Sequence, residues 1–77
     1  MTRYTMNLDK LKEAIEIVGG VGPLASKARL SYQSIIDWRR GLKSPSQTSC
    51  EKIEKATDGK VKAQDLLPDY PWHEVRS

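Results

Sequence analysis

The sequence predicts an all-α fold, a compact bundle of four or five short helices that contains a helix-turn-helix. Apolar residues recur at helical spacing, and capping residues, glycines and prolines divide the chain into short segments. No segment shows the alternation of a convincing strand. The chain has 77 residues, of which 38% are hydrophobic and 30% charged, and this fits one small globular domain. We expect a helix-turn-helix domain over residues 1–69 and a C-terminal tail over residues 70–77.

The first helix is expected to begin after Asn7, which can cap it, and to run to about Val18. Asp9 would lie favourably in its first turn, and Gly19-Gly20 would end it. Its apolar stripe would consist of Leu8, Leu11, Ala14, Ile15 and Val18.

Residues 22–41 predict the helix-turn-helix. Gly22-Pro23 opens its first helix, because proline is tolerated at the first helical position. The second helix, about residues 31–40, follows Ser31, whose hydroxyl can cap it, and buries Ile35 and Trp38. The outer face would consist of Tyr32, Gln33, Ile36, Asp37 and Arg40. A second helix with polar and basic residues outward suits a DNA major groove, although many helical hairpins are merely solvated.

Two more helical segments are expected. Ser44-Pro45 would cap and open a helix that buries Cys50, Ile53 and Ala56 and ends near Thr57, before Asp58-Gly59. A short turn of helix would follow over residues 63–67, with Pro68 ending it. The expected core consists of Leu8, Leu11, Ile15, Val18, Leu24, Leu30, Ile35, Trp38, Ile53, Val61 and Leu66.

The charge is concentrated on the helix-turn-helix. The whole chain carries +3, but residues 22–43 hold five basic residues against Asp37 alone, whereas the remainder from Ser44 onward is slightly acidic. The five basic residues are Lys27, Arg29, Arg39, Arg40 and Lys43. A positive patch favours contact with phosphates through counterion release, so this distribution supports DNA binding.

Composition argues against several other classes. No apolar run approaches a membrane span, and the N-terminus lacks the apolar core of a signal peptide, so we expect a cytoplasmic protein. Cys50 is the only cysteine and His73 the only histidine, which excludes an intrachain disulfide and a four-ligand Cys/His zinc site. We expect no enzyme, no metal and no cofactor, and we expect Cys50 to be a small buried apolar residue.

The segments LASKARLS, IIDWRRG and EKATDGKVKAQDLLPD, in this order, resemble Cro-type repressors of lambdoid phages, in particular the branch grouped with YdaS-like antitoxins. The resemblance extends over about residues 8–69. It implies a sequence-specific DNA-binding repressor, acting as a dimer on a palindromic operator. The alternative that it leaves open is an antitoxin that acts mainly by binding a partner such as a cognate toxin.

The resemblance also implies which residues contact DNA. The base-contacting set would be Tyr32, Gln33, Ser34, Ile36, Asp37 and Arg40. The basic residues and the helix N-termini, apart from the resemblance, predict the phosphate-contacting set, which would be Gly22, Lys27, Arg29, Ser31, Arg39, Lys43 and Ser44. Asp37 would either read a cytosine or, as we favour, pair with Arg40 or Arg29. Arg29 departs from the family pattern, because it stands where the turn usually has glycine.

The dimer surface is not evident, since the chain has no heptad repeat and no long strand edge. Tyr70 and Trp72 are the best candidates, because large aromatic groups on a polar tail are costly to leave in water. The alternative is that Trp72 folds back on its own subunit. We expect a weak homodimer that DNA strengthens.

Overall fold

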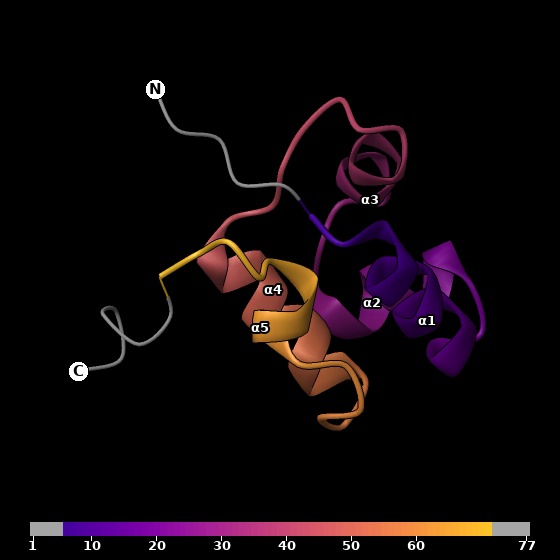
Figure 1. Cartoon of the computed structure of the whole chain (residues 1–77). Coiled ribbons are helices and arrows are strands. Elements are labelled where there is room, and N and C mark those ends of the chain that lie inside the picture. The colour runs from indigo at the N-terminus through magenta and orange to yellow at the C-terminus, as the bar shows by residue number, and fades with distance from the viewer. Residues whose placement is uncertain (1–5, 72–77) are drawn as a thin grey trace.

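The computed structural model describes residues 6–71, which form five helices and no strand. The helices are α1 (Leu8–Val18), α2 (Val21–Ala28), α3 (Tyr32–Arg39), α4 (Gln47–Ala56) and α5 (Ala63–Leu66). Figure 1 shows α4 beside α5, α1 in front of α2, and α3 at the top of the view. The expected all-α fold is therefore confirmed. Within residues 6–71, no helix is long and apolar enough to cross a bilayer.

The first helix begins and ends at the predicted residues. The side-chain oxygen of Asn7 accepts hydrogen bonds from the amides of Asp9 and Lys10, at 3.1 and 3.3 Å. Gly19 has a φ of 97°, a left-handed conformation that glycine adopts without strain, and the next amide, Gly20, closes the helix end onto the Ile15 carbonyl.

Two predicted helix starts are wrong by two residues. Helix α2 begins at Val21 after Gly20, so Pro23 is its third residue, where its missing N–H still costs no helical hydrogen bond. Helix α4 begins at Gln47, because Ser46 rather than Ser44 accepts the capping hydrogen bond, from the Ser49 amide at 3.2 Å. Pro45 is buried, so it anchors the loop before the helix instead of opening the helix.

The core lies between α1, α2, α4 and α5, and Ile35 and Trp38 of α3 close it on one side. Most of the expected core residues are buried or packed against it. Leu8 is the exception: it lies in the first turn at the edge of the stripe and is 46% exposed. Met6 and Leu67 are buried although the sequence did not suggest it, and the Asn7 amide donates to the Leu66 carbonyl at 2.8 Å. This hydrogen bond joins the start of α1 to the end of α5.

Buried side-chain hydrogen bonds hold the connection between α4 and α5. The Thr57 hydroxyl is buried; it accepts from the Val61 amide at 3.2 Å and donates to the Glu54 carbonyl at 3.1 Å. The Glu54 carboxylate accepts from the Ala63 amide at 2.9 Å, at the start of α5. Asp58 has a φ of 55°, so a non-glycine residue adopts the left-handed conformation here.

Candidate nucleic-acid interface

The turn between α2 and α3 keeps the left-handed conformation although it lacks glycine. Arg29 has φ and ψ of 57° and 45°, and the Leu30 amide donates to the Ala25 carbonyl at 2.8 Å, which closes α2. A left-handed non-glycine residue costs about 1 kcal/mol. Ser31 then caps α3 as predicted, by accepting from the Ser34 amide at 3.4 Å. The turn is therefore closed by a backbone hydrogen bond and the Ser31 cap, with an exposed cation where glycine would avoid the strain.

Helix α3 presents one buried face and one exposed face. Ile35 is fully buried and Trp38 is 5% exposed, which confirms their predicted place in the core. Most of the predicted outer face is accessible. Tyr32, Gln33 and Arg40 are exposed, and Ile36 and Ser34 are half-buried.

Asp37 is the residue that departs from the expected outer face. It is only 9% exposed, and its carboxylate pairs neither with Arg40 nor with Arg29. One oxygen accepts from Gln33 Nε2 at 2.9 Å, and the other lies 3.7 Å from the Lys43 ammonium group. The i to i+4 spacing of Gln33 and Asp37 could have indicated this pair from the sequence, because such residues are neighbours on a helix.

This pairing fixes the orientation of the Gln33 amide. An ionised carboxylate only accepts hydrogen bonds, so the NH2 group of Gln33 must face Asp37. That NH2 group has a second N–H, and the Gln33 carbonyl oxygen is not used by Asp37. One donor and one acceptor are what an adenine edge requires in the major groove.

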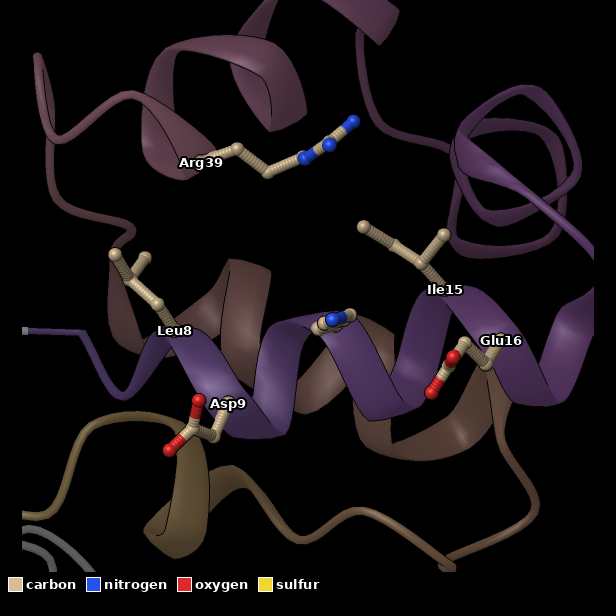
Figure 2. Close-up of a pocket in the computed structure, with 6 residues that line it drawn as sticks. Leu8, Asp9, Ile15, Glu16 and Arg39 are labelled. Carbon is tan, nitrogen blue, oxygen red and sulfur yellow. The ribbon is translucent and has the colours of Figure 1, made fainter.

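The remaining cations of the helix-turn-helix lie around α3 rather than on one surface. Arg39 is exposed but faces α1, where it lines a hollow of about 420 Å³ together with Leu8, Ile15 and Glu16. Figure 2 shows its side chain extending over α1, opposite Leu8 and Ile15. Lys43 lies in the loop after α3, and its side chain is 70% exposed despite the contact with Asp37.

Two predicted phosphate contacts depend on helix N-termini. Gly22 lies in the first turn of α2, whose N-cap Gly20 makes no side-chain hydrogen bond, so first-turn amides remain for a ligand. Ser44 does not lie at the N-terminus of α4, since it precedes the cap Ser46 by two residues. Lys27 and Arg29 are both exposed near the C-terminal end of α2.

Of the two residues expected at the dimer surface, Tyr70 lies in the described part of the chain and contacts its own core. Tyr70 packs against the core of its own chain, and its hydroxyl donates to Gln47 Oε1 of α4 at 3.0 Å. Trp72 lies outside the described residues. Tyr70 therefore contributes to the fold of the single chain.

Cys50, which we expected to be a buried apolar residue, is fully buried on α4. Burial, with the negative charge of Glu51 as a smaller cause, raises the pKa of its thiol to about 12. The thiol is therefore protonated at neutral pH and is shielded from reagents.

These features are those of a helix-turn-helix protein: a small helical domain in which α3, the second helix of the motif, is capped and exposes a polar and basic face. The family model described as bacterial toxin YdaS matches residues 11–75, and the chain belongs to this family. The expected resemblance is thus confirmed, although the description names a toxin, whereas the branch that the sequence resembles is grouped with YdaS-like antitoxins. The match covers most of the chain.

Two curated relatives match over most of this chain. The first, from Escherichia coli (strain K12), is named "Putative transcriptional regulator YdaS" and is 34% identical over 65 residues, covering 84% of this chain and 66% of the relative. The chain therefore spans just under two thirds of that relative. The second, "Regulatory protein cro" of Pseudomonas phage D3, is 31% identical over 61 residues, covering 79% of this chain and 84% of the relative. No solved structure shows significant similarity.

Proposed function

We propose that the chain is a sequence-specific DNA-binding transcriptional regulator of the Cro type, which inserts α3 into the major groove. The names of both relatives, a transcriptional regulator and a Cro regulatory protein, support this function. The observation that carries the proposal is the Gln33 amide, exposed on α3 and aimed by the buried Asp37. An aimed amide loses less conformational entropy on binding and suits base recognition.

The structure changes the roles that we propose for the predicted residues. Base contacts come from the accessible residues of α3, whereas Asp37 acts by orienting Gln33. The proposed base-contacting residues are Tyr32, Gln33, Ser34, Ile36 and Arg40. Phosphate contacts come from cations, from groups at the starts of α2 and α3, and from the loop after α3. These are Gly22, Lys27, Arg29, Ser31, Arg39, Lys43 and Ser44.

The direct test is selection of bound sequences from a random duplex pool. The wild-type chain should enrich one palindromic site, and Gln33→Ala should lose the preference for one base pair in each half-site, worth about 1–3 kcal/mol. Gln64→Ala, an exposed glutamine on α5, is the matched control and should leave the selected sequence unchanged. Enrichment of no sequence by the folded wild-type chain would overturn the proposal.

Asp37 gives a second test of the same interface. Asp37→Leu removes the acceptor that aims Gln33, so it should relax the same base pair as Gln33→Ala. Asp37→Asn keeps an acceptor oxygen at this position and should restore much of the preference. A loss at a different base pair would mean that Asp37 contacts DNA itself.

We further propose that two copies bind the operator, with half-sites about 34 Å apart, because one short helix contacts few base pairs. The test must spare Tyr70, which packs on the core. A chain that ends at Pro71 should therefore melt as the full chain does but bind an operator with less cooperativity. Equal cooperativity would place the dimer surface outside residues 72–77.

The word toxin in the family description favours a second function, binding to a partner protein. The salt dependence of binding to duplex DNA separates the two. A DNA-binding protein loses affinity steeply as salt rises, because each phosphate contact releases condensed counterions. An affinity for duplex DNA that does not change with salt, or no binding to duplex DNA, would favour a protein partner.

A further inference from the structure

A basic hollow lies between the C-terminal end of α2 and the side of α4. It has a volume of about 200 Å³ and is lined by Lys27, Ala28, Arg29, Lys52 and Lys55. Four of these five residues carry a positive charge, and none carries a negative one. The charge count along the sequence hides this arrangement, because Lys52 and Lys55 belong to the slightly acidic C-terminal half.

Helix α4 separates its charges into two rows, which explains how the hollow becomes basic. Lys52 and Lys55 are three residues apart on an exposed side. Glu51 and Glu54 form the neighbouring row, and the Glu54 carboxylate is turned to the Ala63 amide at the start of α5. The carboxylates of α4 therefore do not line the hollow.

None of the four cations forms an ion pair with another described residue. Within residues 6–71, the ion pairs are Lys10–Glu13 and Lys43–Asp37, and neither includes a residue of the hollow. Lys27 and Lys55 lie in the last turns of their helices, where the helix dipole favours a cation. That explanation does not extend to Lys52, which lies in the middle of α4, or to the strained Arg29.

Through Arg29, the hollow includes the turn that leads into α3, at the end of α3 that we expect to approach DNA first. Arg29 precedes the α3 cap, Ser31, by two residues, while no residue of α3 lines the hollow. From this arrangement we propose that the basic hollow binds the phosphodiester backbone of the same duplex, beside the groove that α3 enters. The proposal rests on the proposed function and adds Lys52 and Lys55, on α4, to the DNA-binding surface.

The test compares two double variants with the same change in net charge. Lys52→Gln/Lys55→Gln removes both positive charges that α4 contributes to the hollow, whereas Lys60→Gln/Lys62→Gln removes the charges of two exposed lysines outside it. Affinity for duplex DNA is measured over a range of salt concentrations. The first variant should lower the slope of log affinity against log salt by about one to two units, since each phosphate contact contributes about 0.9. The control should keep the wild-type slope.

Measurements on duplexes of different length then show whether the hollow contacts the same duplex as α3 or another ligand. The Lys52→Gln/Lys55→Gln variant should lose affinity for a selected operator extended by about ten base pairs, roughly one helical turn. The loss of affinity should be smaller on a duplex trimmed to the half-sites. A loss confined to complexes with two duplexes would overturn the proposal in favour of DNA bridging. Equal slopes for the two variants would also overturn it and favour an acidic protein partner. A wild-type chain without salt-dependent binding would instead overturn the proposed function.

Discussion

The α2–α3 turn and the α4–α5 connection both contain a left-handed residue that is not glycine, but they are held in different ways. Arg29 has a φ of 57° and Asp58 a φ of 55°. After Asp58, the chain is fixed by the buried Thr57 hydroxyl and by the Glu54 carboxylate. After Arg29, the chain is fixed by backbone hydrogen bonds and by the exposed cap Ser31.

This difference separates stability from recognition. Hydrogen bonds of Thr57 are shielded from water, so losing one leaves a buried group without a partner, which is costly. The side chains of Arg29 and Ser31 are exposed, so substitutions at these two positions change the surface and leave the core intact. The α4–α5 connection thus maintains the framework, while the α2–α3 turn is the part that we propose presents groups to DNA.

The largest expected effect is on the framework side, at Thr57. Thr57→Val keeps the shape but removes the hydroxyl, so the buried Val61 amide loses its partner. The Glu54 carbonyl still accepts from the Gly59 amide. We expect the free energy of unfolding to fall by about 1–3 kcal/mol. Thr48→Val, an exposed position on α4, is the control in urea unfolding, and an equal loss there would contradict the comparison.

Cys50 tests how well the framework helix α4 excludes water. The folded pKa of about 12 lies above the ordinary value of 9.0, so the unfolded chain releases the thiol proton first. The stabilisation is complete below pH 9 and decreases as pH rises toward 12, by about 1–2 kcal/mol at pH 10. Cys50→Ala should be less stable at neutral pH but should lose less between pH 7 and pH 10. Parallel unfolding curves with pH would show that the thiol is accessible.

Much of the fold was predictable because short-range patterns determine it. The α1 boundaries, the Ser31 cap and the burial of Trp38 follow from capping residues and helical spacing. The start of α4 was not predictable in this way, because Ser44 and Ser46 are both good caps. The burial of Pro45 decides between them, and that depends on packing with distant residues.

The site was predictable to a smaller extent. The exposed polar face of α3 and the Gln33–Asp37 pair follow from helical spacing, but the contact of Asp37 with Lys43 does not, since it depends on where the loop carries Lys43. The basic hollow was missed for a similar reason. It joins residues of α2 and α4 that are more than twenty positions apart, and a count of charges by segment assigns them to different regions.

The smallest expected effect on stability, and the sharpest test of the comparison, comes from replacing each left-handed residue with glycine. Arg29→Gly and Asp58→Gly both relieve backbone strain of about 1 kcal/mol, and both lose part of that gain because glycine makes the unfolded chain more flexible. We expect net changes within about 0.5 kcal/mol for either variant. Aspartate tolerates this conformation better than arginine does, so Asp58→Gly should gain less.

Binding should distinguish the same two variants. Arg29→Gly removes a cation from the turn before α3, so its affinity for duplex DNA and its salt slope should both fall. Asp58→Gly removes a negative charge from the framework side, so its affinity should not fall. Arg29→Lys keeps the charge and the strain, and it should restore most of the slope, which shows that the loss comes from charge. If both glycine variants bound DNA equally well, the α2–α3 turn would be a second framework connection, held at a cost in strain that DNA binding does not explain.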